Sequence, residues 1–286
     1  MHIAMTYTRL RTEERLLLDA IESIGVRVTP VDLRGIVFDP ADAGEWARYD
    51  AVLDRSVSLT ATLTALRLIE GYGVRCINPL RSIEVCADKL RTTIELVRAG
   101  VPTPAVRVAT NADAGLRAVE AIGYPAVLKP TVGSWGRLVA RLNDRDAAEA
   151  ILEHRETLGS VQQGVVYAQE HVDKPGRDIR VFVVGGEPIA AIVRSSDHWV
   201  TNTARGAQAE GLAINDELRD ASARAAAAVD ADVVAVDVLE DPRRGLLVNE
   251  LNHSMEFRNS IDTTGVDIPA AVARHAVAIA EGAAAC

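Results

Sequence analysis

A short apolar stretch near the C-terminus carries acidic side chains where a buried strand should have none. Two apolar runs, residues 233–239 and 246–251, flank the turn-forming segment EDPRRG. This arrangement predicts a β-hairpin with a loop of a few residues. Asp237 interrupts the first run, and Glu250 and Asn252 end the second. Since residues two apart project from the same face of a strand, the last two side chains point the same way.

The expected register of this hairpin brings its oxygen-bearing side chains together. We take the loop to close with Asp241 opposite Leu246. Asp237 then lies opposite Glu250, and Asn252 adds an amide oxygen. Two carboxylates in a core repel each other unless a cation or a proton lies between them, so we disfavour a purely structural hydrogen-bond network here. An all-oxygen set favours Mg²⁺, which normally shares its coordination with nucleotide phosphates.

Composition narrows the class of protein. The chain has 286 residues, and this length suits two or three subdomains. Its hydrophobic fraction of 48% is enough to form a core. Its net charge of −9 argues against a nucleic-acid partner. We expect no membrane association and a cytoplasmic location, because no apolar run reaches the length of a membrane span and the start lacks a signal-peptide pattern. Cys76, Cys86 and Cys286 have no ligand-like spacing, which indicates reduced thiols and no zinc site.

Lysine is rare in this chain, and its few positions are informative. Only three of the 31 basic residues are lysine, namely Lys89, Lys129 and Lys174. A solvated surface charge can be either lysine or arginine, so the exceptions are candidates for sites that need a compact ammonium group. We interpret Lys174, beside Pro175 and Gly176 in a predicted turn, as a chance occurrence. The other two are judged by their surroundings.

Residues 1–78 are predicted to form an N-terminal α/β domain. Short apolar segments alternate with helical patterns, which indicates a parallel sheet covered by helices. No GxGxxG follows the first strand, so a dinucleotide site is not supported. Residues 6–11 and 54–58 should lie at the carboxyl ends of strands, where sheets of this kind bind ligands.

Residues 79–170 form the second predicted domain. One helix should run from near Ser82 to Gly100 with Lys89 on it, where a surface ion pair with Asp88 is the simpler alternative. Lys129 ends an apolar strand and precedes the loop TVGSWGR, in which glycines allow the backbone to approach a ligand. The loop is not a P-loop, because no GK[ST] follows. Trp135 within it could cover a nucleotide or simply pack.

Residues 171–286 form the third predicted domain, which includes the acidic hairpin. A second hairpin turns at Gly185 and Gly186. Asp178 and Arg180 alternate along one face of its first strand, where they could simply pair with each other. A polar loop follows, and residues 268–280 should form a closing helix.

The polar residues named above, taken in chain order, resemble the pattern of the ATP-grasp superfamily. The resemblance covers nearly the whole chain. The closer similarity is to the LysX/ArgX-type ligases, which charge an amino-group carrier protein; the stretches LDRSVS, VNELNHSMEFRNS and TTGVDIP carry it. RimK-type glutamate ligases are the nearest alternative. The implied fold is α/β (α+β), with the N-terminal domain followed by two α+β lobes that clasp ATP. The residues in the order of the pattern are Lys89, Lys129, the loop Gly133–Ser134–Trp135–Gly136, Gln169, Glu170, Asp178, Arg180, Arg194, Asn202, Asp237, Glu250 and Asn252.

The resemblance also implies roles for the matching positions. The two lysines and the glycine-rich loop would contact ATP phosphates, and Glu170 and Val172 would flank the adenine. Asp237, Glu250 and Asn252 would hold Mg²⁺, two ions in all. Arg194 and Asn202 would face the transferred phosphate and the acyl centre. The amino-acid pocket would be defined by Arg258, Asn259, Thr263 and Thr264.

The implied reaction is ATP-dependent amide formation on a carrier protein. The carrier is small and acidic, and its terminal glutamate side chain would be converted to an acyl phosphate, which the α-amino group of 2-aminoadipate or glutamate then attacks. Arg177, Arg205 and Arg258 are candidates for a basic docking surface, and the family leads us to expect a homo-oligomer. A ligase that adds glutamate to a protein tail or joins free amino acids is the enzymatic alternative, and a non-catalytic amino-acid-binding protein is the other.

Overall fold

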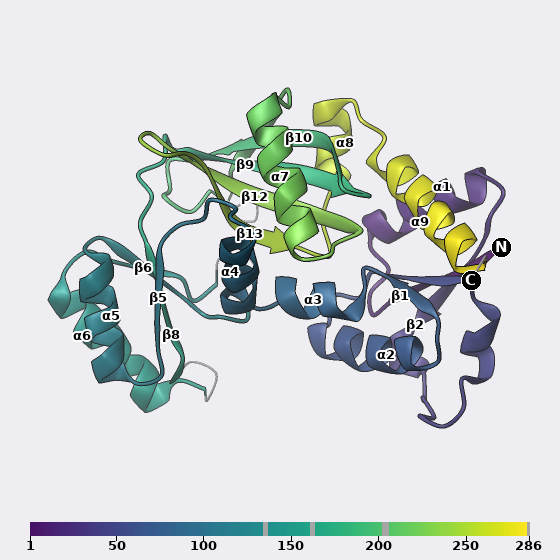
Figure 1. Ribbon diagram of the computed structural model, residues 1–286, viewed down its shortest axis with the longest axis horizontal. Helices are drawn as coiled ribbons and strands as arrows, with labels where there is room; N and C mark the ends of the chain where they lie inside the picture. The colour runs from purple at the N-terminus through teal and green to yellow at the C-terminus, as the bar shows by residue number, and fades with distance from the viewer. Residues whose placement is uncertain (134–136, 161–163, 202–205, 285–286) are drawn as a thin grey trace.

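Three β-sheets lie next to one another along the long axis of the molecule (Figure 1). The structure, a computed structural model, describes residues 1–133, 137–160, 164–201 and 206–284. A five-stranded sheet occupies the middle, with the sheet of the N-terminal residues on one side and the sheet of β5 to β8 on the other (Figure 1). The α+β architecture expected from the sequence is therefore confirmed.

The N-terminal sheet is parallel, as the alternating pattern predicts. Its strand order is β2-β1-β3-β4. The C-terminal helix α9 packs against α1 of this sheet, so the first and last helices lie together (Figure 1). The bounds are β1 His2–Tyr7, α1 Thr12–Ser23, β2 Arg27–Asp32, the 3₁₀ turns Leu33–Gly35 and Gly44–Arg48, β3 Ala51–Asp54, α2 Leu59–Gly71, β4 Arg75–Ile77 and α9 Ile268–Ala284.

The single helix expected from Ser82 to Gly100 is in fact two helices. Helix α3 spans Leu80–Cys86 and α4 spans Lys89–Arg98. The break arises because the Asp88 carboxylate accepts the backbone N–H groups of Leu90 and Arg91, at 2.8 and 3.2 Å, and so caps a new helix. Lys89 therefore lies at a helix start, and the Asp88 carboxylate serves as its cap.

The next sheet is antiparallel, in the order β5-β8-β6-β7. Two helices pack together beside it and bury the apolar side chains of its strands (Figure 1). We call this part, with its two helices, the central lobe. Its elements are β5 Val106–Ala109, α5 Ala112–Ile122, β6 Ala126–Lys129, β7 Ala140–Leu142, α6 Arg145–Leu158 and β8 Val166–Glu170.

The five-stranded sheet has the order β11-β10-β9-β12-β13 and is antiparallel. The turn at Gly185 and Gly186 is confirmed, and both residues have positive φ, 59° and 79°, which glycine adopts without a steric penalty. The elements are β9 Arg177–Val184, β10 Glu187–Ser195, β11 Gln208–Gly211, α7 Asp216–Ala228, β12 Val233–Asp241, β13 Gly245–Asn252 and α8 Arg258–Thr264.

The acidic hairpin is β12–β13, and its register differs from the prediction near the loop. Asp241 lies opposite Gly245, one residue earlier than expected. A bulge at Asn249 then restores the register, so that Asp237 lies opposite Glu250 as predicted. The extra residue in the bulge is Asn249, and its side chain lines the cavity described below.

Two buried side chains join the N-terminal sheet to the five-stranded sheet. Asn78 donates to the carbonyl of Val233 at 2.8 Å and accepts its N–H at 2.7 Å. Arg55 donates to the carbonyl of Met255 at 3.0 Å. The division at residues 78 and 170 stays a prediction, although α9, which it assigns to the third domain, packs on the first. In the described part of the chain, no helix combines the length and apolar character needed to cross a membrane.

Candidate active site

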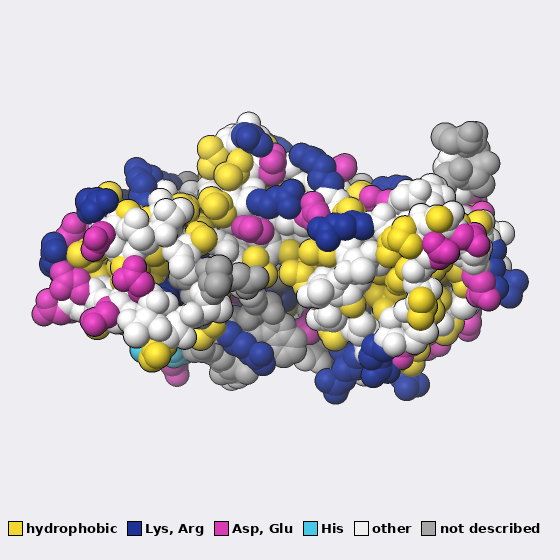
Figure 2. Space-filling view, turned by 90° about the horizontal axis from the view of Figure 1, so that it is seen from below, with side chains coloured by type: hydrophobic (Ala, Val, Ile, Leu, Met, Phe, Trp, Pro, Cys, Tyr) yellow, Lys and Arg dark blue, Asp and Glu magenta, His cyan; other side chains and the backbone are white. Residues whose placement is uncertain are grey.

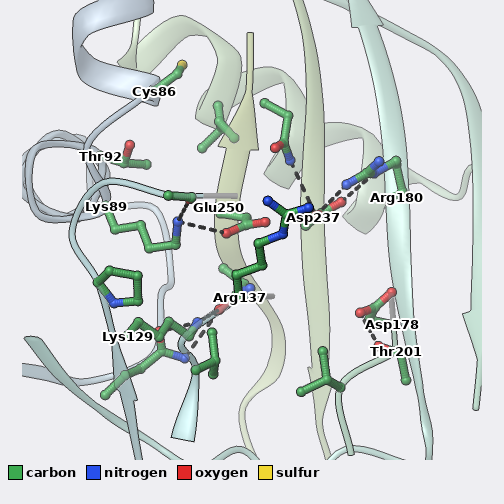
Figure 3. Close-up of a pocket in the computed structure, with 18 of the residues that line it drawn as sticks. Cys86, Lys89, Thr92, Lys129, Arg137, Asp178, Arg180, Thr201, Asp237 and Glu250 are labelled. Carbon is green, nitrogen blue, oxygen red and sulfur yellow. Dashed lines mark hydrogen bonds and ion pairs between the residues drawn. The ribbon is translucent and has the colours of Figure 1, made fainter. Parts of the chain in front are cut away.

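A cavity of about 470 Å³ lies where the three sheets meet, and the described residues that we expect to bind ATP and Mg²⁺ line it (Figure 3). This volume is typical of a small-molecule site. Among the described residues that line it, seven are arginine or lysine and five are aspartate or glutamate. The site is therefore locally basic in a chain whose net charge is −9, which suits a polyphosphate ligand.

Asp237 lies at the bottom of the cavity, and two arginines neutralise it. Arg180 donates to both of its carboxylate oxygens, at 2.7 and 2.8 Å, and Arg194 lies 3.3 Å away. Burial alone would raise the pKa of Asp237, but these two guanidinium groups hold it well below its usual range. Arginines on neighbouring strands thus supply positive charge beside Asp237, and the metal expected at this residue stays a prediction.

The donor set nevertheless fits Mg²⁺. Glu250 faces the cavity with 30% of its side chain exposed, and the Asn252 amide lies 3.4 Å from the Asp237 carboxylate. No cluster of three or more His, Cys, Asp or Glu occurs among the described residues. Two carboxylates and one amide oxygen suit an ion that takes its remaining ligands from phosphates and water.

Asp178 and Arg180 do not pair with each other, contrary to one reading of the sequence. On β9, Asp178 lies opposite Arg194 of β10, and their side chains meet at 2.6 Å. Arg180 lies opposite Asp237 of β12. Directly opposed side chains on neighbouring strands are closer than residues two apart on one strand, so the cross-strand pairs form instead.

Lys129 is buried, with 9% of its surface exposed, and its ammonium group bridges two strands. It donates to Gln169 at 2.9 Å and to Asn249 at 3.0 Å. The pKa of Lys129 is lowered to about 8, chiefly by burial; Glu250 opposes this shift, and the neighbouring Lys89 and Lys174 add to it. Sequence reasoning missed Asn249, because only the bulge turns this residue toward the lysine.

This lowered pKa predicts a pH-dependent nucleotide affinity. Lys129 is charged below about pH 8 and loses its proton as the pH rises through that value, so the affinity for ADP should fall above pH 8. Calorimetry between pH 7 and 9.5 should show a weakening that approaches tenfold per pH unit, with proton uptake on binding. The Lys129→Met variant should bind more weakly and show a flat profile. A flat wild-type profile would contradict the assignment.

All three lysines line the cavity, so the interpretation of Lys174 as a chance occurrence is wrong. Its ammonium group donates to the Thr201 hydroxyl at 2.5 Å and lies 3.5 Å from Asp178. The Thr201 hydroxyl in turn donates to Asp178. The turn that contains Lys174 follows β8 and folds back onto β9, which the sequence alone does not reveal. These contacts tie that turn to the loop after β10.

Lys89 lies 3.6 Å from Glu250 and donates to the carbonyl of Gly133 at 2.7 Å. It therefore connects the acidic hairpin with the beginning of the glycine-rich loop. Ser134, Trp135 and Gly136 of that loop, and Asn202 and Arg205 of the later polar loop, lie outside the described residues.

Glu170 and Val172 lie at the end of the cavity formed by β8. The Glu170 carboxylate accepts the backbone N–H of Ala105 at 2.7 Å and pairs with Arg244 at 2.7 Å. Val172 is buried against Leu239 and Leu247. An apolar contact beside polar backbone at a strand end is what a planar heterocycle requires.

The residues expected to form the amino-acid pocket are not among the described lining residues. Arg258 and Asn259 are exposed on α8. The hydroxyl of Thr263 donates to the carbonyl of Asn259 at 2.7 Å, and that of Thr264 donates to Ser260 at 2.6 Å. Both hydroxyls are thus bonded within their own helix.

The fold and the cavity together define an ATP-grasp protein. A solved structure described as a RimK domain ATP-grasp protein from Sphaerobacter thermophilus superimposes with a TM-score of 0.80 at 28% identity, covering 97% of this chain and 100% of that one. Residues 86–276 match the RimK-like ATP-grasp domain, and residues 3–85 match the LysX preATP-grasp domain. The chain belongs to the RimK-like ATP-grasp family and is an ATP-dependent ligase.

Two curated relatives cover nearly the full length of the chain. The glutamate–LysW ligase ArgX of Sulfurisphaera tokodaii is 32% identical over 94% of this chain and 95% of its own length. The alpha-aminoadipate–LysW ligase LysX of Sulfolobus acidocaldarius is 34% identical over 91% of this chain and 95% of its own. The similarity therefore includes the N-terminal domain as well as the nucleotide-binding part.

Proposed function

We propose that this enzyme forms an amide between the side-chain carboxylate of the terminal glutamate of a small acidic carrier protein of the LysW type and the α-amino group of 2-aminoadipate or glutamate. The observation that carries the proposal is the cavity in which three lysines and two largely buried arginines lie around an acidic hairpin. The full-length similarity to two LysW ligases supports the choice of carrier and amino acid.

We propose a place in the cavity for each part of ATP. The adenine would lie at Glu170 and Val172, and Gln169 orients Lys129 beside it. Lys89, Lys129 and the loop from Gly133 would bind the phosphates. Asp237, Glu250 and Asn252 would hold Mg²⁺, for which we propose two ions; the bound metal neutralises phosphate charge and orients the terminal phosphoryl group.

The residues of the cavity suit the chemistry of acyl phosphate formation. A carboxylate is a poor acylating agent, so its oxygen attacks the γ-phosphorus of ATP, the P–O bond to ADP breaks, and an acyl phosphate forms. The amine then bonds to the acyl carbon as inorganic phosphate leaves. Arg194 is 5% exposed, and Asp178 and Asp237 fix its orientation; we assign its charge to the stabilisation of the transferred phosphoryl group. We assign Asn202 to the same centre from its position in the family pattern.

An acidic carrier should dock on a part of the enzyme surface that is not itself acidic, because like charges repel. Helix α6 of the central lobe carries Asp146, Glu149, Glu153 and Glu156, and Figure 2 shows acidic side chains dense at this end of the molecule. We therefore place the carrier away from the central lobe, with Arg258 and the partly exposed Arg177 as candidate contacts. A homo-oligomeric state and a cytoplasmic location stay predictions.

Intact-protein mass spectrometry tests the proposal. A LysW-type carrier ending in glutamate is incubated with the enzyme, ATP, Mg²⁺ and either amino acid. We expect the carrier mass to increase by one 2-aminoadipate or glutamate residue, with one ADP formed per amide. A carrier whose terminal glutamate is replaced by glutamine is the control and should stay unmodified. Equal modification of both carriers would instead favour a ligase that extends protein tails.

A further inference from the structure

An ion pair lines the end of the cavity nearest the N-terminal sheet, and none of the roles assigned so far uses it. Arg11 follows β1, and Glu256 follows β13. The Nη1 atom of Arg11 lies 3.2 Å from Oε1 of Glu256, and both residues border the cavity beside Ser56 and Ser254. Two parts of the chain that are 245 residues apart thus meet at one wall of the cavity.

Glu14, on the side away from Glu256, holds the Arg11 side chain in one orientation. Its Nε and Nη2 atoms donate to the two carboxylate oxygens of Glu14 at 3.0 and 2.8 Å. Glu14 is fully buried and also pairs with Arg55 at 3.3 Å. This bidentate contact fixes the plane of the guanidinium group and directs Nη1 toward Glu256.

The ion pair is accessible, and its two members differ in exposure. The side chain of Arg11 is 19% exposed and that of Glu256 is 46% exposed. The guanidinium group is therefore a fixed part of the wall, whereas the glutamate reaches over it from the solvent side. A carboxylate that enters the cavity can take the place of Glu256 at Nη1, because exposed ion pairs contribute only about 0–1 kcal/mol.

The position of this pair complements the nucleotide end. Lys89 and Lys129 contact the acidic hairpin and the central lobe, on the side of β8. Arg11 follows β1 of the N-terminal sheet, and this sheet lies on the other side of the five-stranded sheet (Figure 1). A ligand that extends from the phosphates toward the N-terminal sheet would therefore reach Arg11.

We propose that Arg11 and Glu256 bind the head group of the incoming amino acid, with the α-carboxylate accepting from Arg11 and the α-amino group donating to Glu256. This inference rests on the proposed function. Opposite charges on adjacent atoms of an amino acid match the opposite charges of this pair. 2-Aminoadipate and glutamate share the same head group, so the ion pair would bind either of them. Other residues would then select the length of the substrate side chain.

Steady-state kinetics of Arg11→Leu and Glu256→Gln test this assignment. Both should raise the KM for the amino acid roughly 10- to 100-fold, as expected for loss of a charge-assisted hydrogen bond, with the KM for ATP changed less than twofold. Exposed residues of the same two segments provide matched controls, Arg9→Leu and Asp262→Asn, which should leave both constants unchanged. Should Arg11→Leu fail to fold because Glu14 loses its partner, Glu256→Gln alone carries the test.

A modified substrate gives a second readout. The wild-type enzyme should use glutamate α-amide roughly 10- to 100-fold less efficiently than glutamate, because the amide lacks the charge that Arg11 recognises. Arg11→Leu should no longer distinguish the two substrates. Discrimination equal to that of the wild type, or an unchanged KM for the amino acid in Glu256→Gln, would overturn the inference.

Hydroxylamine separates this inference from the proposed function. It traps an acyl phosphate as a hydroxamate and carries no carboxylate, so the variants should slow hydroxamate formation on the carrier far less than amide formation. Hydroxamate formation by the wild type, combined with unaltered amino-acid kinetics in the variants, would overturn the head-group assignment alone. An absence of hydroxamate with ATP and the carrier would instead overturn the proposed function.

Discussion

Glu250→Gln should reduce ADP formation by roughly 10²- to 10³-fold and leave the fold intact. Glutamine keeps the shape of the side chain but removes the negative charge that a divalent cation requires. Because 30% of the Glu250 side chain is exposed and its ion partner Lys89 lies at the cavity wall, the loss of this charge should cost little stability. Initial rates of ADP release at saturating ATP and Mg²⁺, together with a urea unfolding curve, provide the measurement.

The same hairpin supplies a matched control for this prediction. Glu240 lies on β12, and its carboxylate pairs with the partly exposed Arg177. Glu240→Gln should leave the rate of ADP release unchanged. Near-normal rates in Glu250→Gln over a range of Mg²⁺ concentrations would rule out this residue as a metal ligand.

Asp237→Asn should lower the free energy of unfolding by about 3–5 kcal/mol and also abolish turnover. Asp237 is 4% exposed and accepts from Arg180 while lying 3.3 Å from Arg194. Removing its charge leaves the guanidinium groups of Arg180 and Arg194, whose side chains are 16% and 6% exposed, without part of the negative charge that balances them. The cost in stability arises because Arg180 and Arg194, on neighbouring strands, both depend on this carboxylate. Chemical denaturation followed by circular dichroism measures the effect.

A double variant separates stability from catalysis at this position. Combining Arg180→Gln with Asp237→Asn replaces a charged pair by a neutral one, and should restore about half of the lost free energy or more. Activity should not return, because the metal ligand is still missing. Recovery of turnover in the double variant would show that Asp237 acts only as the partner of Arg180.

The elements of the fold follow closely from local sequence patterns. Alternating strands and helices predict the parallel N-terminal sheet, and the glycine pair at residues 185 and 186 predicts its hairpin correctly. The pairing of Asp237 with Glu250 is also as predicted, but it depends on a bulge at Asn249 that the sequence pattern does not signal. The helix break at Asp88 was missed, because a capping aspartate inside a helical pattern resembles any other polar residue.

Contacts between distant segments could not be predicted in this way. Which arginine neutralises Asp237 depends on strand order, since β9 lies between β10 and β12 in space but precedes both in sequence. Asn249 reaches Lys129 only because of a bulge, and Lys174 enters the cavity only because its turn folds back. The pairing of Arg11 with Glu256 joins two ends of the chain, and no local pattern signals it.

The packing of α9 against α1 has a consequence for how the protein acquires its structure. Ile268 and Ala276 of α9 share one core cluster with Leu17 of α1 and with strands of both neighbouring sheets. The N-terminal α/β domain therefore lacks part of its core until α9 has been synthesised. Contacts between residues as far apart as Leu17 and Ile268 form slowly, so chains that stop before α9 should be more protease-sensitive than chains that include it.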